Sequence, residues 1–402
     1  MRSTARALLP LILPLALAAC SGRSVTNAFL GSALRQAAYG AAPATPTDAR
    51  YVLLSGDMHC HVAPPDDVGD VSRGFDDTVA LAEEHHLDFV VLTPHVSSRF
   101  FADPSARSQV ADGQRALRAT IAAQSAKDAA ARKQGVLFVP GFEYTDHRWG
   151  HVGVAFADLD TVLGDVSLDA AKAHPEAFFA AWVARGGTLV IHHPFVTPLD
   201  SIFAMARVDL SWKSWTTKKP APTEIAAIER LAVGYEAYNA QVTHLRDALL
   251  LHDDRVSIDA TMKRLDADLV AEPARTLVPT GGTDSHGPAL SATTWVLATA
   301  RTAAAVHDAI VGGRVCARAP QACSLEVKVG DGWAPIGSRV NGVDGVDVRA
   351  KGTAIEIYAG GVLVARPESG QVVHVAVKPG RCTVVRARVD DGVSAPILVD
   401  CG

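Results

Sequence analysis

Between residues 51 and 315, short apolar runs alternate with longer amphipathic stretches, and no other feature constrains the fold as strongly. The runs have the length of buried strands, and the stretches between them have helical spacing. This alternation predicts a mainly parallel sheet closed into a barrel. Strands are expected at residues 51–55, 87–93, 136–143, 150–154, 188–191, 233–239, 276–280 and 294–297, and helices at 76–86, 108–133, 175–185, 224–231, 242–265 and 302–311.

Histidine and carboxylate side chains recur at the ends of these apolar runs. The clearest case is Gly56-Asp57-Met58-His59-Cys60-His61, directly after the first run. Residues two apart on a strand share a face, so the two imidazoles can converge on one metal ion or on neighbouring ions. In a barrel, the carboxyl ends of the strands form the rim that carries the active site. We therefore expect one site that contains His59, His61, His95, Glu143, His193, Asp284 and His286.

The size of this set predicts a site with several metal ions. Seven potential ligands exceed the needs of one tetrahedral ion, and a bridging carboxylate would fit the number. Imidazole and carboxylate ligands suit Zn, Mn or Fe. We expect two or three divalent ions per chain.

The composition is that of an ordinary globular protein. Hydrophobic residues make up 48% of the chain, charged residues 20%, and the net charge is -5. There is no basic excess, so we expect no nucleic-acid surface. The substrate that we expect is a small molecule or a phosphorylated compound.

Residues 1–20 have the pattern of an export signal. Arg2 and Arg6 precede an apolar run that is too short to span a bilayer, and it ends in Leu17-Ala18-Ala19-Cys20. This ending looks like a bacterial lipobox, which would make Cys20 a lipid-modified N-terminus. An ordinary secretory signal with a chance cysteine is the alternative. Because Ser21 and not Asp follows Cys20, we expect a lipid anchor in the outer membrane and a periplasmic catalytic domain.

The two ends of the chain differ from its centre in composition and in the pattern of apolar residues. Residues 21–50 are rich in Ala, Ser, Thr and Pro, which predicts a flexible tether. After about residue 322, short alternating runs are broken by Gly, Asp and Pro, as in a small antiparallel β-sandwich. The expected domains are the signal (1–20), the tether (21–50), the barrel (51–320) and the β-sandwich (321–402).

Four of the six cysteines lie in the last quarter of the chain. In an exported protein they can form disulfides, and four cysteines allow three pairings. We favour the local pairs Cys316–Cys323 and Cys382–Cys401. Cys60 lies between two motif histidines and is expected to be a buried core residue rather than a ligand.

The ordered motifs resemble those of the polymerase-and-histidinol-phosphatase (PHP) superfamily over residues 51–315. The family's second motif, Thr-Asp-His, reads Thr93-Pro94-His95 here. The other motifs match at Asp57, His59 and His61 (Asp-x-His-x-His), Gly141 and Glu143 (Gly-x-Glu), His151, His193 and Pro194 (His-Pro), and Gly282, Thr283, Asp284 and His286 (Gly-Ser/Thr-Asp-x-His).

The resemblance implies a distorted (β/α)7 TIM-like barrel with up to three metal ions. A first ion would have His59, His61, Glu143 and Asp284 as ligands. A second would share Glu143 and add His151 and His193. The third would take His95, His286 and an acidic residue of the loop after His61, where Asp66 has the family's spacing and Asp67 and Asp70 are rivals.

Pro94 is the main departure from the family pattern. It replaces a carboxylate that would orient His95, and loss of such a group commonly weakens metal binding. A two-metal enzyme is therefore the alternative to a three-metal one.

Several neighbours of these residues have other expected roles. His192 is predicted to be a packed or supporting histidine, because the His-Pro motif selects His193. Glu236 and Asn239 are expected to orient ligands or to contact substrate. Arg99 and Arg148 follow ligand positions and are candidates for binding an anionic substrate.

These observations predict metal-dependent hydrolysis by a hydroxide held between two ions, with Glu143 and His193 at the reacting centre and Asp284 or a bound water taking the proton. A phosphoesterase is the family-level expectation. A carbamate or carboxylic ester hydrolase is the alternative, because an exported barrel with a C-terminal β-domain is similar to a branch with carbamate-hydrolysing members. Pro94 favours a third reading, a non-catalytic envelope binding protein.

Overall fold

The structure is a computed structural model that describes residues 48–146, 148–195, 210–217, 220–241, 255–341 and 344–401. The predicted signal, the lipobox with Cys20 and nearly all of the tether lie outside these residues. So does the first half of the helical region predicted at 242–265. None of the described helices is both long and apolar enough to cross a membrane.

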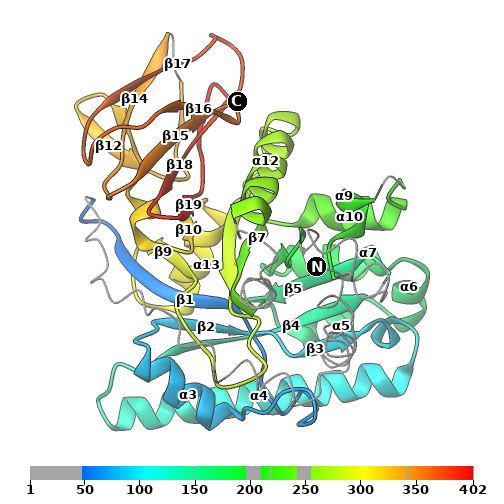
Figure 1. Cartoon of the computed structure of the whole chain (residues 1–402). Coiled ribbons are helices and arrows are strands. Elements are labelled where there is room, and N and C mark those ends of the chain that lie inside the picture. Colours follow the sequence, from blue (N-terminus) through cyan, green and yellow to red (C-terminus); the bar gives the residue numbers. More distant parts are fainter. Residues whose placement is uncertain are drawn as a thin grey trace, which may run out of the picture.

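The first strands of the α/β region run parallel to one another in the main sheet (Figure 1). β1 (Val52–Cys60) pairs with β2 (Phe89–Leu92), and β2 pairs with β4 (Leu137–Asp146). The short β3 (His95–Ser97) continues beside the later part of β4, where His95 lies opposite Glu143. The strand pairing thus brings two predicted ligands into register.

The later strands of the α/β region form both antiparallel and parallel pairs. β5 (Gly150–Ala155) is antiparallel to its neighbours β4 and β6 (Thr188–Ile191). β6, β7 (Gly234–Asn239) and β8 (Val278–Gly282) are parallel again. The expected α/β fold is confirmed, with β5 and β9 (Thr294–Ala298) as antiparallel members.

The sheet differs from a closed barrel at the edge of β1. β9 pairs with residues 52–56 of β1 and so occupies the position that β8 would need for closure. Among the described residues, no strand ladder joins β8 to β1. The gap is bridged beyond β9, where the Asp284 amide donates to the His59 carbonyl at 2.7 Å and the His61 amide donates to the Ser285 carbonyl at 3.3 Å. Closure therefore occurs at the rim that carries the predicted ligands.

Helices cover the outside of this sheet, with α3 and α4 below it in the view of Figure 1. Asp103 caps α4 by accepting from the amides of Ser105 and Ala106, which explains why this helix begins before the predicted residue 108. The helices are α3 (Phe75–Glu84), α4 (Pro104–Ala130), α5 (Leu159–Asp165), α6 (Leu168–Ala173), α7 (Pro175–Ala184), α9 (Lys213–Thr216), α10 (Thr223–Leu231), α12 (Arg255–Ala271) and α13 (Ala303–Val311), with 3-10 turns η1 (Ser98–Phe101) and η3 (Pro320–Ser324).

The C-terminal strands form two antiparallel layers. One is a four-stranded sheet in the order β12-β11-β14-β17, and the other continues the main sheet through β10, β19 and β18. The sandwich thus shares strand pairing with the α/β region. Its strands are β10 (Val315–Ala317), β11 (Glu326–Val329), β12 (Gly332–Pro335), β13 (Arg339–Val340), β14 (Gly345–Arg349), β15 (Ile355–Ala359), β16 (Val362–Ala365), β17 (Val373–Ala376), β18 (Thr383–Val389), β19 (Gly392–Ser394) and β20 (Ile397–Val399).

Two kinds of contact stabilise this region. The disulfides Cys316–Cys323 and Cys382–Cys401 are both present, so the favoured pairing is confirmed. Cys60 is a free and buried thiol, also as expected. α12 stands beside β18 in Figure 1, and buried Arg386 of β18 contacts Asp266 of α12 at 2.9 Å. A charged pair therefore ties the C-terminal strands to a helix of the α/β region.

Candidate metal centre

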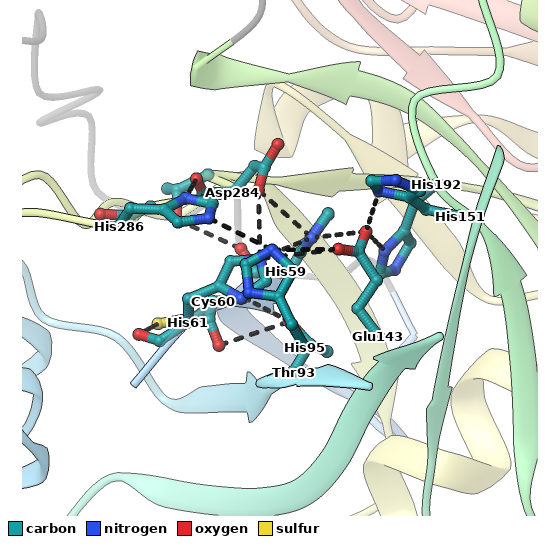
Figure 2. Close-up of polar contacts among 12 residues, drawn as sticks. His59, Cys60, His61, Thr93, His95, Glu143, His151, His192, Asp284 and His286 are labelled. Atoms are coloured by element: carbon teal, nitrogen blue, oxygen red, sulfur yellow. Dashed lines mark hydrogen bonds and ion pairs between the residues drawn. The ribbon is translucent and has the colours of Figure 1, made fainter. Parts of the chain in front are cut away.

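The predicted ligands converge at the rim of the sheet (Figure 2). Most of them are almost fully buried, and His95 is the most open, with 31% of its side chain exposed. Four groups of donors have ligand atoms within 4.8 Å of one another: His59/His61/Asp284, Glu143/His151/His193, His61/His95/His286 and His59/Glu143/His192. The first three correspond closely to the three sets that the motifs predict.

Glu143 lies at the centre of the cluster. Its Oε1 is 3.2 Å from Nε2 of His59, 3.2 Å from Nδ1 of His151 and 3.5 Å from Nε2 of His193. Its Oε2 is 3.7 Å from Nε2 of His95 and 3.9 Å from Nε2 of His61. A single carboxylate therefore contacts members of every group, as a bridging ligand would.

His59 and His61 present their Nε2 atoms to the same region. The two nitrogens are 3.2 Å apart, and Asp284 Oδ1 is 3.4 Å from the first and 3.2 Å from the second. Nitrogen ligands on a tetrahedral Zn ion, with bonds of about 2.0–2.1 Å, are separated by roughly 3.4 Å. The donor set thus has the chemistry and spacing of a metal site.

His151 supplies an independent test of this fit. Its ring is buried, its Nδ1 meets Glu143 Oε1 at 3.2 Å but outside hydrogen-bond geometry, and its Nε2 has no hydrogen-bond partner among the described residues. Leaving a buried polar group unpaired costs about 1–3 kcal/mol. Coordination of an ion by His151 would remove this cost.

The protonation states of three predicted ligands also suit a metal site. Burial opposes ionisation of Glu143 and Asp284, but the surrounding histidines outweigh it and lower the pKa of both carboxyls. Burial, together with neighbouring His61, lowers the pKa of His286 to about 3. Metal ligands must be ionised carboxylates and neutral imidazoles, and these three groups are in that state at neutral pH.

Glu236 and Asn239 form hydrogen bonds with predicted ligands. Glu236 Oε1 lies 3.0 Å from Nδ1 of His59, and its Oε2 accepts from the His193 amide at 2.6 Å. The Asn239 amide donates to Glu236 Oε2 at 3.1 Å and to Asp284 Oδ2 at 3.2 Å. Both residues act on metal ligands through hydrogen bonds.

Asp66 is the acidic loop residue that reaches the site, while its rival Asp67 is exposed and binds the Gly69 amide. However, Asp66 is not in any of the four donor groups. Its two oxygens contact Nδ1 of His61 and Nδ1 of His95, on the side of each ring away from Nε2. The geometry therefore differs from the ligand role that the resemblance implied.

Arg99 and Arg148 are exposed, and their described contacts lie away from the donor groups. Arg99 pairs with Asp103 at 2.5 Å, and the Arg148 guanidinium lies 5.6 Å from the centre of the Trp149 ring. The structure does not bring either of them to the predicted ligands.

His192 contacts two predicted ligands, as a packed or supporting histidine would. Its Nδ1 lies 2.8 Å from Glu143 Oε1, and its ring stacks on His59 with centroids 3.7 Å apart. A side chain at Gly153 would meet the His192 ring, with a Cβ only 2.1 Å from Nε2. Gly153, two residues after His151, was the sequence feature that could have indicated a ring packed across β5 at this point.

Two non-glycine residues at the same rim have a positive φ. His193 has φ 27° and Asp284 has φ 52°, values that are uncommon for residues other than glycine. Such conformations persist where surrounding contacts fix them, and they cluster at functional sites. Here they point two predicted ligands toward the centre.

Comparisons with known proteins give structural likenesses. No family model and no curated protein matches the chain. A crystal structure of a two-domain protein containing a predicted PHP-like metal-dependent phosphoesterase from Bacteroides vulgatus is 15% identical, covering 87% of this chain and 94% of that chain with a TM-score of 0.43.

Two further solved structures are similar. PsfC from Pseudomonas syringae is 17% identical, covering 65% of this chain and 89% of that chain with a TM-score of 0.37. A lesion-specific endonuclease from Pyrococcus furiosus is 13% identical, covering 71% of this chain and 64% of that chain with a TM-score of 0.34. Because all three TM-scores are below 0.5, the function proposed below rests on the residues of this chain.

Proposed function

We propose that this protein is a metal-dependent hydrolase of the PHP type and that it acts on phosphate esters. The observation that carries this proposal is the position of the buried Glu143 carboxylate, which contacts His59, His151 and His193 at once. A buried carboxylate surrounded by imidazoles is the arrangement expected of a ligand shared between ions. The choice of phosphate esters follows the family resemblance of the motifs.

Each ion has an assigned set of residues. His59, His61, Glu143 and Asp284 would hold the first ion, and Glu143, His151 and His193 the second. His95 and His286 would belong to the third. Zn, Mn or Fe bound there would activate water near neutral pH and stabilise charge on the attacked group.

The chain's own residues bind, orient and move protons. Glu143 and His193 belong to the reacting centre. His193 Nδ1 lies 3.0 Å from the Leu210 carbonyl, so in the neutral ring Nδ1 carries the proton and Nε2 is available to a metal ion. Asn239 holds Asp284 Oδ2, which leaves Oδ1 toward His59 and His61. We assign the transfer of the proton to Asp284, with Asn239 keeping its carboxylate in place.

A covalent mechanism through Cys60 is unfavourable. The thiol is buried, and burial raises its pKa to about 12, so it stays protonated at neutral pH. The thiolate is the nucleophilic form of cysteine. Cys60 therefore serves as a core residue beneath the histidines.

The two alternatives remain distinct from this proposal. A carbamate or carboxylic ester hydrolase would use the same residues, and the combination of an α/β region with a C-terminal β-sandwich favours it. A non-catalytic envelope binding protein is less favoured, because the position of Asp66 gives His95 a carboxylate partner despite Pro94.

The proposed setting is the bacterial envelope, with Cys20 as the lipid anchor and the catalytic region in the periplasm. Disulfides form and persist in oxidising compartments such as this one. The presence of Cys316–Cys323 and Cys382–Cys401 supports this location.

Hydrolysis assays on the purified full chain test the function. We expect turnover of p-nitrophenyl phosphate or bis-p-nitrophenyl phosphate and at least a roughly 100-fold loss in Glu143→Gln, since this change removes a shared ligand. Glu272→Gln, at a surface pair with Arg275, is the matched control. Hydrolysis of a naphthyl carbamate in preference to both phosphates would instead establish the alternative.

A further inference from the structure

We propose that Asp66 is a positioning residue for the third ion and not one of its ligands. In this role it takes over the support of His95 that Pro94 cannot provide. The inference rests on the proposed metal-dependent function and concerns the same site. It follows from three contacts of one buried carboxylate.

Asp66 uses both of its oxygens on the two histidines. Oδ1 accepts from the His95 amide at 2.7 Å and lies 2.9 Å from His95 Nδ1. Oδ2 lies 3.2 Å from His61 Nδ1. The side chain is 97% buried, so these contacts are made away from solvent. A carboxylate oriented in this way has both oxygens committed to N–H groups.

These contacts fix the tautomers of the two rings. A carboxylate can only accept, so each Nδ1 must carry the proton. His286 is fixed in the same way, because its Nδ1 lies 2.9 Å from the Asp284 carbonyl. In the neutral form of each ring, Nε2 is therefore the acceptor, which is the form that binds a metal.

The freed nitrogens lie on the other side of the rings and face one another. Nε2 of His95 and Nε2 of His286 are 3.4 Å apart, and one nitrogen of each of His61, His95 and His286 lies within 4.8 Å of the others. His61 stacks on both partner rings, with centroid distances of 4.0 and 4.1 Å. Asp66 thus supports His95, which is assigned to the third ion, and His61, which is assigned to the first, from behind.

Carboxylates that accept from a ligating histidine commonly control metal affinity by 10- to 100-fold. The isosteric change Asp66→Asn is a sharp test of this role. One Nδ1 would then face the amide NH2, and that ring would have to move its proton to Nε2, where it blocks the metal. Asp67→Asn, one residue away and exposed, is the matched control.

The experiment uses the full chain labelled with 15N-histidine and loaded with Zn²⁺. Side-chain 1H–15N spectra report the tautomer of each ring, and zinc titration reports the affinity of each ion. We expect protonated Nδ1 and zinc-bound Nε2 at His95, three zinc ions per chain, and a 10- to 100-fold weaker third ion in Asp66→Asn. Asp67→Asn should match the wild type.

Three results would overturn the inference. They are a zinc-loaded His95 without a proton on Nδ1, a wild-type chain with two zinc ions only, and an Asp66→Asn chain whose third ion binds as tightly as in the wild type. If any of these occurs while phosphate esters are still hydrolysed, the proposed function survives. A chain that neither binds zinc nor hydrolyses any ester overturns both.

Discussion

Glu236 Oε1 lies 3.0 Å from Nδ1 of His59, and both side chains are buried beneath the rim of the sheet. The other oxygen of this carboxylate accepts from the backbone amide of His193. Glu236 therefore supports a ligand of the first ion and the backbone of a ligand of the second. Together with Asp66, it gives both histidines of the His-x-His motif a carboxylate partner at Nδ1.

Replacing Glu236 with Gln should weaken the first ion. The neutral amide removes the charge that holds His59 in its tautomer, and such changes commonly cost 10- to 100-fold in metal affinity. Competition with a chelator of known affinity measures this effect. Glu84→Gln, an exposed position, should leave all affinities unchanged. An unaltered first ion in Glu236→Gln would show that His59 does not depend on this contact.

Gly282→Ala should damage the same site by steric means. An added Cβ would lie 2.2 Å from Cβ of His59 and 2.3 Å from Glu236 Oε1, closer than atoms can approach. We expect loss of metal and of turnover, with the folded state retained by circular dichroism. Gly164→Ala is the control, since nothing lies within 4 Å of a Cβ there. Wild-type metal content in Gly282→Ala would contradict this packing.

Metal binding should strengthen as pH rises toward 9. Burial lowers the pKa of His61, but the hydrogen-bonded carboxylates of Asp284 and Asp66 outweigh it and raise the pKa to about 9 in the metal-free chain. Below that pH a metal must displace this proton, so the apparent dissociation constant should fall about tenfold per pH unit. Calorimetric titration in buffers of different ionisation enthalpy counts the protons released.

The stability of the metal-free chain should show the opposite trend. The folded pKa of His61 lies above its unfolded value of 6.5, so its contribution to stability is complete below pH 6.5 and is lost as pH rises through about 9. His61→Gln should flatten this dependence in urea unfolding. Equal slopes for His61→Gln and the wild type would rule out a raised His61 pKa.

The pair between Arg386 and Asp266 should matter for folding. Both side chains are buried, and the Arg386 guanidinium also lies 4.4 Å from the centre of the Tyr358 ring. Burial raises the pKa of Asp266, and Arg386 opposes this. Arg386→Ala leaves a buried carboxylate without its partner and should cost about 3–5 kcal/mol in the free energy of unfolding. Arg386→Met combined with Asp266→Leu should recover most of it, as measured by urea unfolding.

The sequence predicted the α/β fold because its apolar runs are short, regular and separated by helical spacing. The convergence of seven polar residues followed from their positions at strand ends, and their division into ligand sets followed from the family resemblance. Glu143, His151 and His193 do come together. The incomplete closure of the barrel could not be predicted, since it depends on which strand pairs with the second edge of β1. That edge is filled by β9, a strand far along the chain.

The roles of Asp66 and His192 were also beyond the sequence. Spacing places Asp66 near the third site, but it cannot distinguish an oxygen facing a metal from one facing Nδ1 of a ligand. Likewise, the His-Pro motif selects His193 over His192, but it does not say where either ring points. The positive φ of His193 turns its ring toward His151, while His192 stacks on His59.

The most direct test of the account is the metal content of the purified full chain, measured by elemental analysis before and after exhaustive chelation. We predict two or three ions of Zn, Mn or Fe per chain, with phosphate-ester hydrolysis lost on their removal and restored on their return. Chelation should also lower the melting temperature, because ions that bind the folded state stabilise it. Near-zero metal, with no turnover after Zn, Mn or Fe is supplied, would contradict a metal-dependent hydrolase.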